Sequence, residues 1–288
     1  MTQTDYRRSE HHEFLDASRG AMADENLQRV LGKLGETLGR KNREAWAAFP
    51  ASDAMRARAR AIKDATLADL DKHLETLEAS VLARGGHVHW APDAASACAH
   101  VVDIVRQHKA AKVVKSKSMT TEEIHLNAAL QAAGVEPIET DLGEFIIQLL
   151  GHRPSHIVGP ALHLSKREVA ETLSEHAGRQ LPEDATELAR YARAQLRDHF
   201  ATAQVGVTGV NFAVAETGTI VLITNEGNGR LTTTLPRVHV AIMGMEKVIP
   251  KLADLPVFLQ VLARAATGQK LSVYTNLCTG PRRPGEVD

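Results

Sequence analysis

The stretch that decides the fold runs from residue 111 to residue 139 and reads AKVVKSKSMTTEEIHLNAALQAAGVEPIE. Its apolar, β-branched start, Ala111 to Lys115, predicts a short strand, and Val135 to Glu139 predicts another. Between them, Thr121 to Ala133 has the apolar spacing of a helix, which Gly134 closes. A strand, a helix and a strand in close succession indicate two parallel strands of one sheet.

The alternation continues on both sides of this stretch. Further helices are predicted over Ala54–Arg84, Ala94–His108, Gly143–Leu150, Ser165–His176, Ala185–Ala203 and Leu252–Ala265. Further strands are predicted over His87–Trp90, His156–Gly159, Val238–Gly244 and Leu271–Tyr274, with two more in Val205–Thr224 joined by a turn at Glu216–Gly218. The run from Val238 is apolar enough for burial on both faces. We therefore expect an α/β fold with an open, mostly parallel sheet flanked by helices.

Three segments are expected along the chain. Residues 1–85 form an N-terminal helical extension, residues 86–280 form the α/β domain, and residues 281–288, with turn-forming composition, form a linker.

Composition excludes several classes of function. The net charge of −1 and the 4% aromatic content leave no basis for nucleic-acid binding. The longest apolar run, residues 220–223, is too short to span a membrane, and no signal peptide is recognisable. Two cysteines, Cys98 and Cys278, suit a reducing cytoplasm and are too few for an iron–sulfur cluster bound by four thiolates.

The turn after the first strand of the opening stretch carries Lys115 and Lys117. Thr120 and Glu123 have the spacing of a capping box, so the helix is expected to start there. Free N–H groups at a helix start attract anions, and two lysines beside them suit a carboxylate or phosphate. The alternative is a helix cap with two solvated lysines.

Three carboxylates follow the second strand of that stretch, at Glu139, Asp141 and Glu144. Ligands of open α/β sheets bind at this edge, where carboxylates can bind a cation or act as acid and base. Alternatively, these residues only stabilise the start of a helix through its dipole. The sequence leaves both interpretations open.

The last third holds two polar loops around an apolar strand. Glu216 lies between small residues at a turn, where a ligand could approach the backbone. The candidate ligand-binding residues, chosen by their place in these loops and in the lysine turn, are Lys115, Lys117, Asn211, Thr217, Asn225, Glu226, Asn228 and Arg230. The alternative is a set of turns with satisfied side chains. His87 and His89 share one strand face without a third ligand, so no metal site is predicted.

The same segments resemble a known family. The runs Lys115–Glu123, Glu139–Gln148, Pro154–Ile157, Thr208–Thr224, Asn225–Pro236 and Thr279–Asp288 are similar to the LUD-domain family, specifically to the iron–sulfur (B) subunit of bacterial L-lactate utilisation systems. The resemblance implies a LUD domain related to the NagB/RpiA/CoA-transferase-like group. It also implies companion subunits with which the protein oxidises L-lactate to pyruvate.

Members of that family continue past the equivalent of Asp288 into a ferredoxin-like region with two [4Fe–4S] clusters, which this sequence does not include. We therefore expect no cofactor in this chain and expect electron transfer to take place elsewhere. By similarity to the wider fold group, Glu216 is the candidate catalytic residue.

Three functions remain in competition. The chain is either the ligand- or partner-binding domain of a lactate-oxidising complex, a free-standing CoA-transferase- or isomerase-like enzyme for a small anionic substrate, or a docking module.

Overall fold

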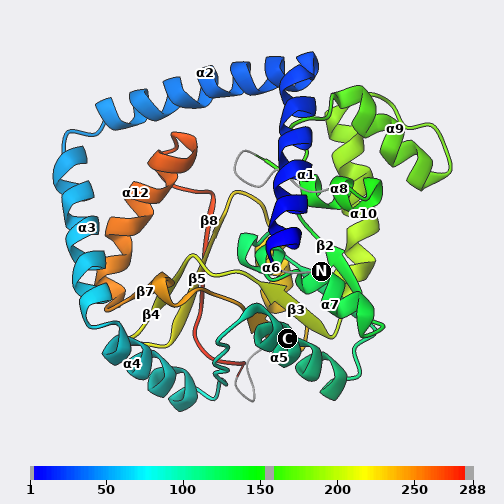
Figure 1. The fold of residues 1–288 in the computed structure, drawn as a ribbon. Helices are drawn as coiled ribbons and strands as arrows, with labels where there is room; N and C mark the ends of the chain where they lie inside the picture. The colour runs from blue at the N-terminus through cyan, green and yellow to red at the C-terminus, as the bar shows by residue number, and fades with distance from the viewer. Residues whose placement is uncertain (1–2, 153–158, 283–288) are drawn as a thin grey trace.

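The computed structural model describes residues 3–152 and 159–282 and contains two four-stranded sheets (Figure 1). Sheet A has the order β2-β1-β3-β6, and all its strands are parallel. Its strands are β1 (Lys112–Lys115), β2 (Glu136–Glu139), β3 (Val205–Thr208) and β6 (Val238–Ala241). The predicted α/β class with a mostly parallel sheet is confirmed.

Helices cover both faces of sheet A because successive side chains of β1 point in opposite directions. Val113 packs in the apolar core shared with α5 (Ala94–Gln107) and α7 (Leu126–Ala132). Val114 packs on the other side, against α8 (Leu142–Leu150), α9 (Lys166–Ala177) and α10 (Ala185–Thr202). Neither valine is exposed, so the opening stretch forms the centre of the molecule.

Sheet B has the order β7-β4-β5-β8 and is mixed. Its strands are β7 (Val248–Ile249), β4 (Phe212–Val214), β5 (Thr219–Thr224) and β8 (Tyr274–Cys278). One core joins it to α3 (Ser52–Ala68) and α12 (Leu255–Thr267), and another to α4 (Leu70–Ala83). Two 3₁₀ turns, η1 (Met245–Lys247) and η2 (Leu252–Asp254), flank β7.

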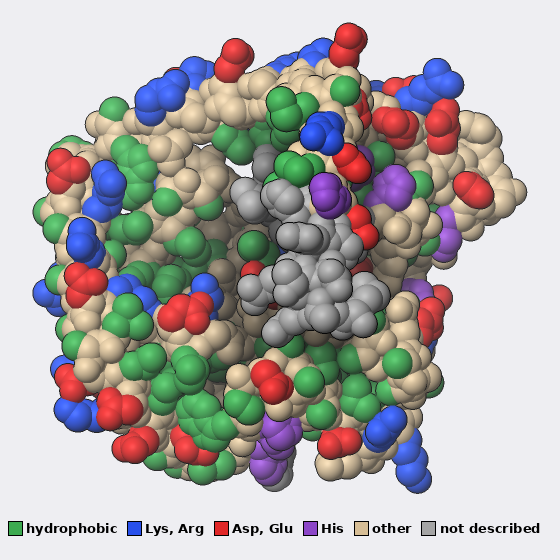
Figure 2. All heavy atoms as spheres, in the orientation of Figure 1, with side chains coloured by type: hydrophobic (Ala, Val, Ile, Leu, Met, Phe, Trp, Pro, Cys, Tyr) green, Lys and Arg blue, Asp and Glu red, His purple; other side chains and the backbone are tan. Residues whose placement is uncertain are grey.

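Two long helices open the chain: α2 (Glu25–Ala47) runs along the top of the molecule in Figure 1, and α1 (Gln3–Ala23) runs down from there towards the middle of the view. The Asn42 amide of α2 donates to the carbonyls of Arg264 and Ala265, each at 3.0 Å, and so anchors α2 to the end of α12. On the face drawn in Figure 2, hydrophobic side chains gather over the region of α3 and α12, while charged side chains are spread along the outer helices. The division at residues 85 and 280 stays a prediction, and residues 283–288 of the expected linker lie outside the described residues.

Local geometry breaks two of the predicted helices. The helix expected over 54–84 is α3 and α4, separated at Asp69. The helix expected over 121–133 is α6 (Met119–Glu123) and α7, separated by His125 in the left-handed conformation with φ 55°. The observed N-cap of α6 is Ser118 rather than Thr120, because its hydroxyl accepts from the Thr121 N–H.

Some strand predictions are wrong, and contacts with neighbouring elements explain why. Residues 87–90 form no strand, because Trp90 is bound through its indole N–H to Glu78 of α4 and through its carbonyl to His100 of α5. Residues 205–224 hold three strands divided between two sheets rather than one pair. β6 is half-buried rather than enclosed, because it forms an edge of sheet A. Most of the strand predicted over 156–159 lies outside the described residues.

Among the described helices, none combines the length and apolar composition that a bilayer crossing requires.

Candidate functional site

The carboxyl ends of four parallel strands meet at one edge of sheet A, the usual place of ligand sites in open α/β sheets. The turn after β1 is fastened to its neighbours there: the Ser116 N–H donates to the Val207 carbonyl at 3.0 Å. Thr140, directly after β2, donates its hydroxyl to the Lys115 carbonyl at 2.6 Å. We call this region the carboxyl edge.

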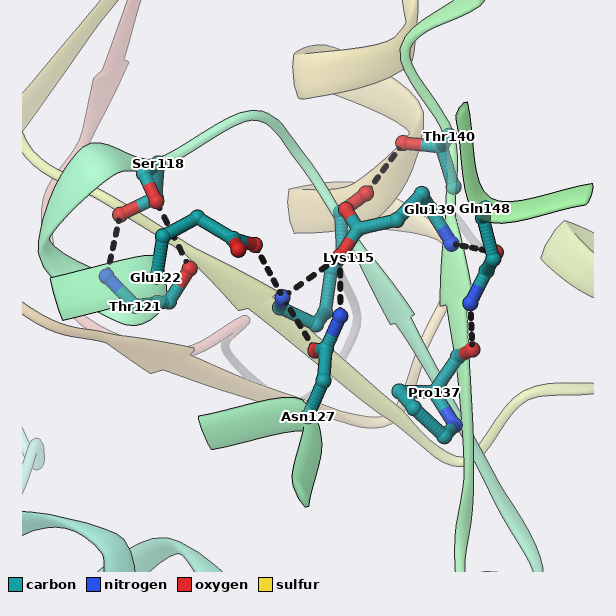
Figure 3. Close-up of polar contacts among 9 residues, drawn as sticks. All are labelled: Lys115, Ser118, Thr121, Glu122, Asn127, Pro137, Glu139, Thr140 and Gln148. Atoms are coloured by element: carbon teal, nitrogen blue, oxygen red, sulfur yellow. Dashed lines mark hydrogen bonds and ion pairs between the residues drawn. The ribbon is translucent and has the colours of Figure 1, made fainter. Parts of the chain in front are cut away.

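A buried lysine lies at the centre of this edge (Figure 3). Only 1% of Lys115 is exposed, and its Nζ lies 2.7 Å from Glu139 Oε1 and 2.5 Å from Asn127 Oδ1. The Asn127 amide also donates to Glu139 Oε1 at 2.8 Å, which closes a ring of three side chains. Glu122 Oε1 is a further neighbour of the ammonium, at 3.7 Å.

The strand pleat and the helix break together produce this ring. Lys115 lies two residues after Val113 and therefore shares its face of the sheet, towards α7. Glu139 is the register partner of Lys115 on β2. Asn127 is the second residue of α7, which begins after the left-handed His125. Buried charge is costly unless it is paired, and here each charge has hydrogen-bonded partners.

A second buried acid lies beside the ring. Glu144, in the first turn of α8, is 3% exposed and is hydrogen-bonded to Glu139. Burial, followed by the negative charges of Glu139 and Asp141, raises the pKa of Glu144 to about 9, although Lys115 opposes the shift. Glu144 is therefore protonated at neutral pH and donates to the Glu139 carboxylate. We call Lys115, Glu122, Asn127, Glu139 and Glu144 the Lys115 cluster.

An exposed rim lies next to the cluster. Lys117 and Glu226 are both exposed and interact electrostatically. Partial burial of its carboxylate, followed by the nearby Asp141, raises the pKa of Glu226, whereas Lys117 and a hydrogen bond from the Leu142 N–H act in the opposite direction. The rim therefore joins the loop after β5 to the start of α8.

The helix α11 (Asn228–Thr234) packs on β3 at this edge. A Cβ on Gly206 would lie 2.1 Å from the Thr232 carbonyl oxygen, so only glycine allows the observed approach. The Thr232 hydroxyl lies 3.5 Å from that of Thr140. Asn228 and Arg230 are thus carried by a helix that touches the carboxyl edge.

The other predicted site residues belong to sheet B. The Glu216 carboxylate accepts from the Leu252 N–H at 3.0 Å, and the Glu216 carbonyl accepts from Ser80 at 3.4 Å. The Asn211 side-chain oxygen Oδ1 accepts from the Ile223 N–H at 2.8 Å, and the Thr217 hydroxyl lies 2.7 Å from that of Thr219. These contacts connect the turns of sheet B to one another.

Asn225 also bonds within this part of the molecule. Its amide donates to Gln269 at 2.9 Å, and its side-chain oxygen accepts from the Val273 N–H at 3.1 Å. The structure therefore brings together Lys115, Lys117 and Glu226 at the carboxyl edge, with α11 beside them. The remaining predicted residues have polar partners in sheet B and its neighbours instead: Glu216, Asn211, Thr217 and Asn225. The functional roles of all these residues stay predictions.

Sequence reasoning did not select four members of the Lys115 cluster. Glu139 and Glu144 belong to the acidic segment that follows the second predicted strand, but neither is among the predicted site residues. Glu122 lies in the run Lys115–Glu123 that the sequence singles out, but neither it nor Asn127 is among the predicted site residues. The sequence offers one indication of Glu122 and Asn127. Both follow Lys115 within the same predicted helical stretch, and each is a polar residue directly after a residue that is buried in the structure.

The described residues contain no group of three or more histidines, cysteines, aspartates or glutamates that could hold a metal ion. A [4Fe–4S] cluster needs four thiolates, and the sequence has two cysteines. The Cys98 thiol donates to the Ile124 carbonyl at 3.2 Å, while Cys278 lies in β8 of the other sheet. These residues do not fit a cluster of that kind.

The fold and the site define an α/β protein with a parallel sheet. A buried lysine–carboxylate cluster lies at the carboxyl edge of this sheet, where open α/β sheets usually bind their ligands. The LUD domain matches residues 74–288 of the sequence. The chain therefore belongs to the LUD-domain family, and the resemblance seen in the sequence is confirmed.

Several curated relatives are similar over most of the chain. Lactate utilization protein B of Bacillus licheniformis is 44% identical, with 94% of this chain and 55% of the relative covered. The protein of the same name from Geobacillus sp. is 45% identical, with 96% and 56% covered. The "Uncharacterized electron transport protein YkgF" of Escherichia coli is 46% identical, with 81% and 49% covered. The chain thus spans about half the length of these relatives.

One solved structure is also similar, that of a DUF162 family protein from Deinococcus radiodurans. It is 17% identical, with 66% of this chain and 91% of the other covered, and a TM-score of 0.23. A score that low says nothing about the details of the fold.

Proposed function

We propose that this chain is the LUD domain of a lactate-utilisation protein and binds a small carboxylate at the carboxyl edge of sheet A. The observation that carries the proposal is the 44–46% identity to proteins named for lactate utilisation. The edge supports it, because Lys117 is exposed directly after the buried Lys115, and the exposed Arg230 is carried by α11, which packs on β3.

In the finer form of the proposal, the protein works with companion subunits that oxidise L-lactate to pyruvate. Iron–sulfur clusters that carry the electrons would then be bound by residues outside this chain, since its two cysteines do not supply four thiolates. The reducing cytoplasm is the expected location, in keeping with two free cysteines.

Genetics tests the role. Deleting the encoding gene should abolish growth on L-lactate and leave growth on pyruvate unchanged, and the wild-type gene should restore it. A gene carrying Lys117→Ala should restore growth poorly, whereas Lys109→Ala, which changes an exposed lysine away from the carboxyl edge, should restore it fully. Normal growth of the deletion strain on L-lactate would refute the proposal.

Ligand binding tests the site separately. The melting temperature of the purified chain should rise with L-lactate or pyruvate in a concentration-dependent way, and Lys117→Ala should weaken that response. A rise with coenzyme A esters or sugar phosphates alone would instead favour a transferase- or isomerase-type enzyme. No response to any of them would leave a docking role.

A further inference from the structure

The Lys115 cluster holds one acid more than a structural ion pair requires. Lys115 and Glu139 neutralise one another at 2.7 Å, and Asn127 bonds to both. Glu144 adds a second carboxyl group, 3% exposed, whose hydrogen bond to Glu139 could equally be made by an amide. A glutamine at position 144 could therefore fill the same space and make the same hydrogen bond. Unlike glutamine, the buried Glu144 carboxyl group can release a proton.

The members of the cluster form a continuous line from the interior to solvent. Glu144 contacts Glu139, and Glu139 contacts Lys115. The side chains of Glu139 and Lys115 are 6% and 1% exposed, whereas that of Glu122, on the far side of the ammonium, is 31% exposed. Of the acidic partners of Lys115 in the described structure, Glu122 is therefore the one that water reaches.

We propose that the Lys115 cluster is a proton relay that carries a proton between the buried Glu144 carboxyl and the half-exposed Glu122 carboxylate. This inference goes beyond the proposed function and does not depend on it. The relay would serve any reaction at the carboxyl edge in which the bound ligand gains or loses a proton.

Each step of the relay moves one proton and no electrons. Lys115 gives an N–H proton to the Glu122 carboxylate, which releases it to water. The Glu144 O–H bond breaks as its proton passes to Glu139, and Glu139 returns a proton to the neutral Lys115 amine. The net change is the loss of one proton from Glu144, and the reverse sequence takes one up. The first step requires the 3.7 Å gap between Lys115 and Glu122 to close, which rotation of the half-exposed Glu122 side chain allows.

The geometry also sets the roles of the remaining members. Asn127 cannot titrate, so it is a positioning residue that holds Lys115 and Glu139 in line. Lysine suits the middle position because a buried ammonium changes its protonation state more readily than a guanidinium. An arginine there would keep the ion pair and block the relay.

The test measures proton movement in the intact chain and needs no ligand. The infrared carbonyl band of a protonated carboxylic acid is recorded at pH 7 and after a rapid jump to pH 10. The wild type should show a band that Glu144→Gln removes and that disappears after the jump. Glu122→Gln should slow the disappearance at least tenfold while the band at pH 7 persists. Glu123→Gln, which changes the exposed neighbouring acid, should behave like the wild type.

Two results would overturn the proposal. One is the absence of a Glu144 band at pH 7, which would mean that no proton is stored there. The other is an unchanged rate in Glu122→Gln, which would show that the proton escapes by opening of the sheet edge. Glu122→Asp keeps the charge and lengthens the gap, so an intermediate rate is expected, and circular dichroism of each variant checks that it is folded.

Discussion

Replacing Lys115 by methionine should be one of the most damaging single changes in the chain. Methionine retains much of the apolar side-chain length but removes the ammonium, so the Glu139 carboxylate keeps only the hydrogen bonds from Asn127 and Glu144. Removing one partner of a buried ion pair typically costs about 3–5 kcal/mol. For a chain of this size, that loss lowers the melting temperature by on the order of 10 °C.

A second substitution identifies the cause. In Lys115→Met with Glu139→Gln, no charge is left unpaired, and more than half of the lost stability should return.

Urea unfolding followed by circular dichroism measures these differences. Lys166→Met is the matched control, because its ion pair with Glu183, at 3.9 Å, is about half exposed on both sides and should contribute less than about 1 kcal/mol. A loss below about 1 kcal/mol in Lys115→Met would refute the reasoning. So would equal losses in the single and double variants, because the penalty would then not arise from an unpaired charge.

Three further predictions follow from the same geometry. Glu144→Gln should make the free energy of unfolding depend less on pH. Because the folded state raises the pKa of Glu144 from 4.5 to about 9, the stability that this shift contributes is complete below about pH 4.5 and is lost as pH rises through 9. Urea midpoints measured across this range test the difference. Gly206→Ala should cost about 1–3 kcal/mol through the clash with the Thr232 carbonyl, whereas Gly227→Ala, with open space around it, should cost less; equal thermal shifts would contradict this. Burial lowers the pKa of His239 to about 4, and its Nε2 lies 2.8 Å from the Thr208 hydroxyl. NMR titration should therefore show a neutral His239 down to pH 5. The stability that depends on the neutral form should fall as pH drops from 6.5 towards 4.

The side chain of Gln148 forms hydrogen bonds with the backbone of β2, and the local sequence pattern does not reveal this role. Its amide donates to the Pro137 carbonyl at 2.7 Å and accepts from the Glu139 N–H at 3.1 Å. It thereby satisfies backbone groups on the outer edge of β2, where a further strand would otherwise bond. Nothing in the spacing around residue 148 indicates this role, since it depends on α8 folding back across β2.

The sequence by itself determined the layered class of this protein and most of its element types. Alternation around residues 111–139 predicted the parallel strands β1 and β2, because periodicity and helix caps are local properties of the chain. The same reasoning identified the segments that meet at the carboxyl edge, since parallel strands place all their following turns on one side.

Only the tertiary structure decided which polar residues meet. Strand order placed β3 beside β1 and moved β4 and β5 into a second sheet, which put Glu216 among the turns of sheet B rather than in the Lys115 cluster. The pleat and the break at His125 decided that Lys115 is buried against Asn127 while Lys117, two residues on, is exposed. These outcomes depend on pairing between distant segments, and the local spacing of residues carries no information about that pairing.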